Sequence, residues 1–220
     1  MMDKKVKKII LGGGTPPPSK EIIDYATEGL SSGARILYLT VRVGGAVKYQ
    51  EQCRQLFYEA GFTHFETICG DDVEKEILIK AIQSAELILI GSGNTLKYHR
   101  IYSKGEVKKV LIEAYYSGVP LVGFSAGSLI MPETMLVSYK DNLFGIRVKK
   151  GLGLVTDCVI SAHYSKWREH RMLRAGLKKA KVPIGYGIND DSYLVFENDR
   201  PRFFGTIYIE RNHQIKKSLV

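Results

Sequence analysis

Residues 123–127, with the sequence Gly-Phe-Ser-Ala-Gly, could present Ser125 as a nucleophile. They follow the apolar run 119–122 and precede an apolar stretch that can form a helix, so we predict a strand, a sharp turn and a helix. At such a turn a serine is exposed at the top of a sheet, glycines relieve steric conflict, and the helix N-terminus favours developing negative charge. The bare pattern would also fit a serine that only caps a helix. The strand before it favours Ser125 as a nucleophile.

A glycine-rich turn at residues 91–95, Gly-Ser-Gly-Asn-Thr, could supply backbone amides to the same reaction. It follows the apolar run 87–90, and neighbours in sequence are usually neighbours in space, so we expect it beside Ser125. The amides of Gly93 and Ala126 would then stabilise an oxyanion, an effect usually worth about 3 kcal/mol. A helix N-cap within the turn explains its sequence equally well.

A nucleophilic serine needs a general base, and His163 is the best placed of the five histidines. It follows the predicted strand 155–162, so its side chain should emerge at the edge of the sheet. An acid must orient the base, and Asp190 and Asp191 come after another predicted strand, 184–187. A lone histidine is more often structural, and an Asx-turn would explain the two aspartates as well. The sequence alone leaves these alternatives open.

The elements that would position these residues alternate along the first half of the chain. Short runs rich in Ile, Leu and Val alternate with amphipathic helical stretches, which is typical of a parallel sheet covered on both faces. In such sheets ligands bind beyond the carboxyl ends of the strands, where the residues above should lie. The predicted strands are 8–11, 35–39, 65–68, 87–90 and 121–124, and the predicted helices are 19–30, 49–60, 73–84 and 105–117.

The second half of the chain changes character. Residues 166–179 are predicted to form a helix, and turn-forming residues at 198–201 predict a hairpin. The other elements are short strands at 135–139, 155–160, 184–187, 193–197, 202–205 and 207–211, the last four as a meander. The predicted fold class is α/β: a mostly parallel sheet flanked by helices on both faces, with a C-terminal strand meander.

The composition favours a single catalytic domain over residues 1–220. With 45% hydrophobic residues the chain can bury a full core, and α/β domains of this size are common. No run reaches the roughly 18 apolar residues of a membrane span, and the N-terminus lacks a signal-peptide pattern, so we expect a cytoplasmic protein. Cys53, Cys69 and Cys158 fit neither a disulfide framework nor a metal motif, and are expected to be buried.

The formal net charge of +9 favours anionic partners. The densest basic stretch, 166–181, has helical spacing and is expected to be a solvated helix face. Only Trp167 is placed there as an interleaved aromatic, so no nucleic-acid partner is expected. The glycines at 12–14 suggest a phosphate loop, but prolines at 16–18 stand where that motif needs glycine or Gly-Lys-Ser/Thr. No metal or organic cofactor is indicated.

Four motifs, in their order and spacing, resemble the peptidase E family of serine peptidases, which includes aspartyl dipeptidases and cyanophycinases. They are the turn 91–95, the pentapeptide 123–127, Ala-His-Tyr at 162–164 and Gly-Ile-Asn-Asp-Asp at 187–191, and the match extends through most of the chain. The resemblance implies a fold similar to class I glutamine amidotransferases. It also implies cleavage of peptide bonds on the carboxyl side of aspartate.

By motif match the resemblance also implies roles for individual residues. These are Ser125 as nucleophile, His163 as base, Asp190 as orienting acid, and Gly93 and Ala126 as oxyanion donors. Two positions depart from the family pattern. An aspartate stands at 190 where glutamate is common, which leaves position 191 open as the third member, and a serine stands at 92 where glycine is usual.

Members of this family are thought to recognise the substrate aspartate with an arginine shortly after the histidine. Arg168 stands at that position, with Arg171 as the alternative. A guanidinium suits bidentate binding of a carboxylate, although Arg168 could equally be one more solvated charge. Asn94 is the second expected substrate-binding residue. The expected partner is thus a small acidic peptide, with no nucleic acid and no membrane, and a homodimer is compatible with the sequence.

Two other interpretations stay open. An α/β-hydrolase esterase shares the serine motif but places its acid before its histidine, so that His213 would be the base and His163 structural. That interpretation leaves the turn 91–95 without a role. The other is a non-catalytic ligand-binding module on the same fold, because fold does not fix function.

Overall fold

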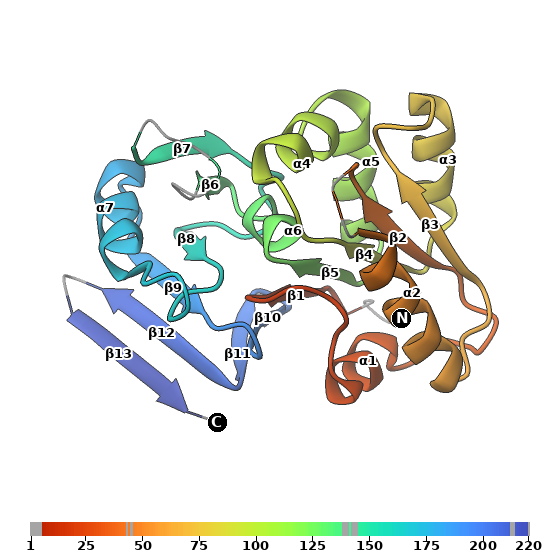
Figure 1. Cartoon of the computed structure of the whole chain (residues 1–220), viewed down its shortest axis with the longest axis horizontal. Helices are drawn as coiled ribbons and strands as arrows, with labels where there is room; N and C mark the ends of the chain where they lie inside the picture. Colours follow the sequence, from red (N-terminus) through yellow and green to blue (C-terminus); the bar gives the residue numbers. More distant parts are fainter. Residues whose placement is uncertain are drawn as a thin grey trace, which may run out of the picture.

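The computed structural model describes residues 6–42, 44, 46–137, 141, 145–211 and 214–219, with residues 46 and 219 described by their backbone alone. A seven-stranded sheet runs through the middle of the larger part of the molecule (Figure 1). Its central and right-hand strands in that view are parallel, and a hairpin adds two antiparallel strands at one edge. In spatial order the strands are β11 (Arg200–Phe204), β10 (Tyr193–Glu197), β1 (Lys8–Gly12), β5 (Leu121–Phe124), β4 (Leu87–Ile90), β2 (Ile36–Thr40) and β3 (Phe65–Cys69).

The apolar runs form strands because both faces of the sheet are covered. Along β1, Ile9 and Leu11 pack into one core cluster and Ile10 packs into another, since successive side chains of a strand point to opposite faces. Helices α1 (Lys20–Thr27) and α2 (Ala46–Glu59) contribute to the cluster of Ile10. The other cluster receives residues of α3 (Lys75–Ser84), α4 (Thr95–Tyr102) and α5 (Gly105–Tyr116). The predicted α/β fold class is therefore confirmed.

A second sheet lies beside the first and consists of four strands from the part of the chain after residue 157 (Figure 1). In spatial order its strands are β13 (Gln214–Leu219), β12 (Thr206–Arg211), β9 (Ile184–Ile188) and β8 (Cys158–Ser161), of which β8 and β9 are parallel. Helix α7 (His170–Ala180) packs on β8 and β9, and the ribbon β6 (Thr134–Val137) and β7 (Arg147–Lys150) packs against α7 and, through β6, against β8. The short helix α6 (Ala126–Leu129) follows β5 directly.

The predicted C-terminal strands are present, but they divide between the two sheets. β9 and β12 pair with each other, whereas β10 and β11 join the large sheet beside β1. The alternation of β10 explains its place there, because Leu194 belongs to one core cluster of the large sheet and Val195 to the other. A strand that is apolar on both faces is best buried between two layers of helices.

The predicted elements need correction or completion at several places. The predicted helix 166–179 begins only at His170, because residues 164–169 form turns and Arg168 has a positive φ of 54°. Helix α4 was not predicted, since its eight residues are mostly polar and only one face, including Tyr98 and Tyr102, is buried. Strands β7 and β13 were not predicted either. The last two residues of the predicted strand 135–139 lie outside the described residues.

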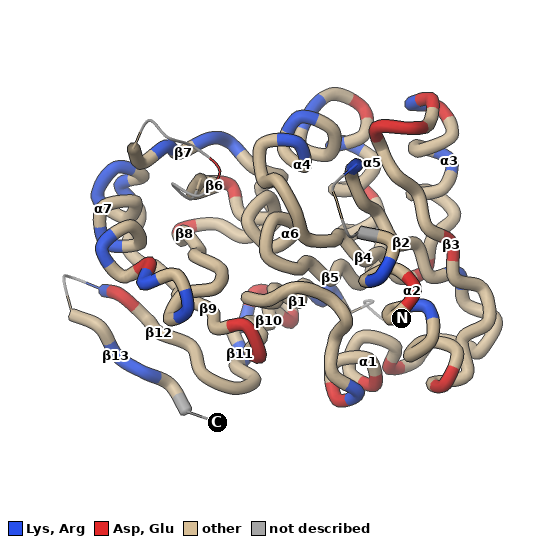
Figure 2. Tube along the Cα trace, viewed as in Figure 1, with Lys and Arg blue, Asp and Glu red and all other residues tan. Residues whose placement is uncertain are grey.

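Basic residues recur along α7 and β7, among other elements (Figure 2). Arg171, Arg174 and Lys178 are exposed on α7, which agrees with the solvated helix face expected from the sequence. The expectation for the cysteines holds for two of three, because Cys53 and Cys158 are buried and Cys69 is half-buried. Within the described ranges, no helix is long and apolar enough to cross a membrane.

Gly127→Ala should lower the free energy of unfolding by roughly 1–3 kcal/mol, as expected for overpacking. A Cβ at this position would lie 2.1 Å from the carbonyl oxygen of Ile90, a backbone atom that cannot move without displacing β4. Urea unfolding of the purified variant measures the loss. The matched control is Gly33→Ala, where no heavy atom lies within 4 Å of the added carbon. Equal effects of the two changes would contradict the prediction.

Candidate active site

Ser125 lies at a sharp turn between β5 and α6. Its backbone φ of 47° and ψ of −105° fall outside the regions that L-residues commonly adopt. The turn depends on a preceding glycine, because a Cβ at Gly123 would lie 2.6 Å from the amide nitrogen of Ser128. Across the sheet, the amide of Ser125 donates a hydrogen bond of 3.0 Å to the carbonyl oxygen of Gly12. The structure therefore contains the strand, turn and helix predicted around Ser125.

Three side chains from distant parts of the chain meet at the carboxyl edge of the large sheet. His163 Nε2 lies 3.1 Å from Ser125 Oγ, and His163 Nδ1 lies 2.8 Å from Asp190 Oδ1. Ser125 is 6% exposed and His163 is 4% exposed. With its proton on Nδ1, the imidazole donates to the carboxylate and accepts from the hydroxyl. This is the spatial order of nucleophile, base and orienting acid that serine hydrolysis requires.

A glycine turn after β1 holds the serine and histidine segments together. The carbonyl oxygen of Gly13 accepts a hydrogen bond of 2.9 Å from the amide of His163, next to the bond between Gly12 and Ser125. Only glycine fits here, because a Cβ at Gly13 would lie 2.2 Å from the carbonyl oxygen of Asn189. The glycines at 12–14 are therefore a scaffold. Sequence reasoning missed this role, although a glycine run at the carboxyl end of a strand was the available signal.

Asp190, and not Asp191, reaches the histidine. Burial raises the pKa of the Asp190 carboxyl, but the hydrogen bonds and positive charges of His163 and Lys166 outweigh burial and hold that pKa below its ordinary value. Lys166 Nζ lies 3.1 Å from the same Oδ1. The carboxylate of Asp191 instead accepts a hydrogen bond of 3.1 Å from Ser192 Oγ. Asp190 is thus ionised at neutral pH, as an acid that stabilises an imidazolium must be.

The two expected oxyanion donors lie next to Ser125. Gly93 and Ser125 line the same two cavities, and the Gly127 amide donates to the carbonyl oxygen of Gly91 at 3.1 Å, which joins the two turns. Neither the Gly93 amide nor the Ala126 amide donates a hydrogen bond to another described residue.

A cleft of about 250 Å³ opens beside Ser125 and His163. A second cavity of about 30 Å³ also touches Ser125, and Asp141 and Glu169 are among the residues that line it. Trp167 lines both spaces. No group of three or more His, Cys, Asp or Glu side chains in the described part of the chain could hold a metal ion. The remaining walls of the cleft are mostly hydroxyl-bearing: Thr15, Tyr38, Thr40, Tyr49 and Ser92.

The two expected substrate-binding residues lie outside this cleft. Arg168 is exposed and lines neither cavity. Asn94 Oδ1 accepts a hydrogen bond of 2.9 Å from the Lys97 amide, so the side chain caps α4. Arg171, the alternative to Arg168, is exposed on α7. His213, the base of the esterase interpretation, lies outside the described residues.

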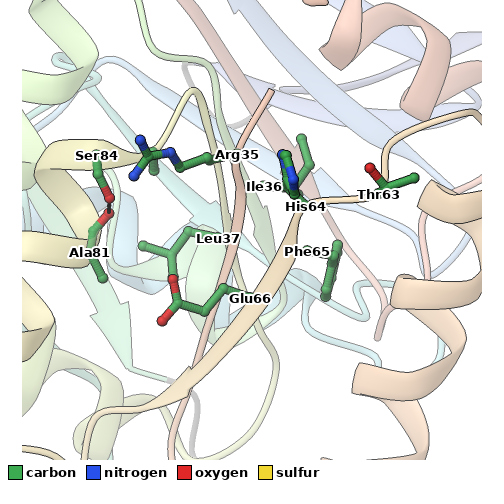
Figure 3. A pocket seen from close by; sticks show the side chains of 10 residues that line it. Arg35, Ile36, Leu37, Thr63, His64, Phe65, Glu66, Ala81 and Ser84 are labelled. Atoms are coloured by element: carbon green, nitrogen blue, oxygen red, sulfur yellow. Dashed lines mark hydrogen bonds between the residues drawn. The ribbon is translucent and has the colours of Figure 1, made fainter. Parts of the chain in front are cut away.

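A larger hollow of about 560 Å³ lies at the opposite edge of the sheet (Figure 3). Residues at the N-terminal ends of β2 and β3 and at the end of α3 line it, including Arg35, His64 and Ser84. His64 is engaged there with the backbone, since its Nδ1 lies 3.0 Å from the carbonyl oxygen of Gly33. Ligands of open α/β sheets bind beyond the carboxyl ends of the strands. The smaller cleft at Ser125 is therefore the candidate active site.

A mostly parallel α/β sheet with serine, histidine and aspartate in contact at its carboxyl edge has the architecture of a serine hydrolase. The model of peptidase family S51 matches residues 9–203, so the chain belongs to this family of serine-type peptidases. The resemblance to peptidase E is confirmed. Peptidase E of Nostoc sp. (strain PCC 7120) is 27% identical over 173 residues, which cover 73% of this chain and 68% of that protein. Peptidase E of Streptomyces coelicolor is 24% identical over 187 residues, which cover 81% of this chain and 74% of that protein.

Solved structures agree on the fold. A peptidase from an acI-B1 actinobacterium superposes with a TM-score of 0.76 at 15% identity, covering 98% of this chain and 95% of the other. A peptidase E protein from Listeria monocytogenes EGD-e gives a TM-score of 0.61 at 15% identity, with 98% and 99% covered. At this level of identity the similarity concerns the fold alone.

Asp190→Asn should lower kcat by roughly 10⁴-fold, because an amide no longer favours the tautomer with the proton on Nδ1. Asp191→Asn is the matched control and should change kcat only a few-fold. Steady-state kinetics on a short peptide measures both variants, and a thermal unfolding scan checks that they are folded. A larger loss in the Asp191 variant than in the Asp190 variant would reverse the assignment.

Proposed function

We propose that Ser125, His163 and Asp190 are the catalytic triad of this serine peptidase, and that it hydrolyses dipeptides or short peptides after aspartate. The observation that carries the triad is the continuous line of contacts from Ser125 Oγ through the imidazole to Asp190, at 3.1 and 2.8 Å. The three residues come from three separate loops. Because they meet, a catalytic role is favoured over the alternative in which Ser125 caps a helix, His163 is structural and the aspartates form an Asx-turn.

The contacts support a two-step hydrolysis. His163 Nε2 takes the hydroxyl proton of Ser125 as Oγ attacks the carbonyl carbon of the scissile bond. The oxyanion accepts hydrogen bonds from the amides of Gly93 and Ala126, and Asp190 stabilises the imidazolium. The imidazolium then gives its proton to the departing amine as the C–N bond breaks, which leaves an acyl ester on Oγ. Water, deprotonated by the imidazole, cleaves the ester and restores the hydroxyl.

The size of the cleft supports a short substrate. At about 250 Å³ it is smaller than the usual range for ligand pockets, and the nucleophile and base are almost fully buried at its base. A folded polypeptide could not bring its backbone to Ser125 without unfolding locally. A dipeptide or a short, extended peptide could.

The basic character of the chain supports an acidic substrate. The net charge is +9, and Arg168 directly follows Trp167, which lines the cleft. To bind an aspartate side chain the guanidinium must turn toward the cleft, and its exposed position leaves room for that rotation. The carboxylates of Asp141 and Glu169 disfavour an acidic group in the small cavity, so the substrate aspartate would lie in the cleft on the side of Arg168.

We also propose a cytoplasmic location. Cys53, Cys69 and Cys158 are all free thiols. Burial raises the pKa of Cys53 and of Cys158 to about 12, so that both stay neutral and unreactive. Free cysteines of this kind are usual in a reducing compartment.

Ser125→Ala should abolish hydrolysis and leave the fold intact, and His163→Ala should be as damaging, because members of a triad act as a unit. Kinetics on an aspartyl dipeptide, together with labelling by a fluorophosphonate probe, measures both changes. His213→Ala is the control and should retain activity. If it is the crippling change instead, the esterase interpretation is correct. If the folded wild-type protein does not react with the probe at all, the non-catalytic module is favoured.

Arg168→Ala should reduce kcat/KM for Asp-X dipeptides by an amount equivalent to roughly 2–5 kcal/mol, since it removes one partner of a charge pair. Ala-X dipeptides should lose much less. Arg168→Lys keeps the charge but not the planar fork, so it should restore only part of the loss. Arg171→Ala, measured in the same way, tests the alternative arginine on α7. Equal losses on Asp-X and Ala-X, or none, would show that Arg168 does not recognise the substrate.

A further inference from the structure

Trp167, the only tryptophan of the chain, packs on the ring of His163. The centroids of the two rings are 4.1 Å apart, and their planes are inclined by 35°. Both ring nitrogens of the imidazole are already engaged, by Asp190 and by Ser125. The indole therefore covers a face of the imidazole, which is the part of the ring that these in-plane hydrogen bonds leave uncovered.

Hydrogen bonds anchor the backbone segment that carries the indole. The Trp167 amide donates a hydrogen bond of 2.9 Å to the carbonyl oxygen of His163, and the Glu169 amide donates one of 2.9 Å to that of Tyr164. Glu169 is 1% exposed, and its carboxylate accepts a hydrogen bond of 3.2 Å from Ser161 Oγ. The segment 163–169 is thus anchored at both ends. These bonds fix the backbone from which the indole projects.

We propose that Trp167 is a positioning residue for the general base. Its indole keeps the imidazole aligned between Ser125 and Asp190, and it stabilises the imidazolium that forms in each turnover. An aromatic face attracts a cation most strongly where water is excluded, and His163 is 4% exposed. This attraction is present only when the ring carries the second proton, so it favours the transition state over the ground state. The proposal rests on the proposed role of His163 as base.

Two charged groups also act on this imidazole. Asp190, from the loop between β9 and β10, binds Nδ1 at the ring edge and stabilises the same protonated form. Lys166 binds the carboxylate of Asp190 and weakens that effect. Trp167 also lines the substrate cleft, so its replacement will change KM whatever else it does. A decisive test therefore needs one readout without substrate and one that depends on pH.

The single tryptophan makes the contact observable without substrate. A protonated imidazole in contact with an indole quenches its fluorescence, so emission of the wild-type protein should fall in one step as His163 is protonated. The step should vanish in His163→Gln and persist in His170→Gln, the matched control, whose histidine is exposed at the start of α7. A step that survives in His163→Gln, or no step in the wild type, would overturn the proposal. Because this readout needs no catalysis, it tests the contact between Trp167 and His163 separately from the proposed triad, so failure of the contact and failure of the triad can be told apart.

The variants Trp167→Phe and Trp167→Leu separate the effect of an aromatic ring from the effect of side-chain volume, because only phenylalanine keeps an aromatic face. Trp167→Leu should lower kcat about two- to thirtyfold, as expected for a lost cation–π contact. It should also move the acidic limb of the kcat/KM profile to lower pH, because the imidazolium loses a stabilising partner. Trp167→Phe should keep most of kcat, and the acidic limb of its kcat/KM profile should stay at the wild-type pH. If Trp167→Leu raises KM or lowers the melting temperature but leaves kcat and the acidic limb unchanged, Trp167 is only a wall of the cleft and the proposal is wrong.

Discussion

Two carbonyl oxygens at the end of β1 hold the candidate site together. The oxygen of Gly12 binds the amide of Ser125, and the oxygen of Gly13 binds the amide of His163. The approach is so close that a Cβ at Gly13 or Gly14 would lie 2.2 or 2.1 Å from a backbone oxygen of the segment 189–190. One glycine turn therefore contacts all three segments that carry the candidate triad. Its backbone bonds are directional, so the relative positions of these segments are fixed before any side chain contributes.

The aspartate at position 190 spans the distance to the histidine by itself. The peptidase E resemblance makes glutamate, which is one methylene longer, common at this position. The carbonyl oxygen of Asp190 lies against Gly14, and its shorter side chain reaches His163 Nδ1 at 2.8 Å. This contact therefore does not need the longer side chain.

Charge is distributed unevenly around the site. The cleft wall consists mostly of hydroxyl groups and aromatic rings, the small cavity carries carboxylates, and basic residues lie outside on α7 and β7 (Figure 2). Removing water from an uncharged wall costs little free energy when a peptide backbone binds there. Exposed cations, in contrast, attract a charged substrate over a longer distance. Binding of the substrate backbone and attraction of its charge are therefore separate in space. Residues 163–169 connect them, because Trp167 faces the cleft and Arg168 faces solvent.

The sequence by itself determined the features that adjacent residues encode. Buried strands are recognised by short apolar runs, and the turn at Ser125 by its flanking glycines, because strand burial and tight turns depend on local residue types. Only the tertiary structure decided which aspartate reaches His163, that Arg168 is exposed and does not line the cleft, and that Trp167 covers the imidazole. These outcomes depend on how distant loops pack against the glycine turn after β1. A difference of one residue in such a loop reverses the direction of a side chain, and nothing in the neighbouring sequence reports that direction.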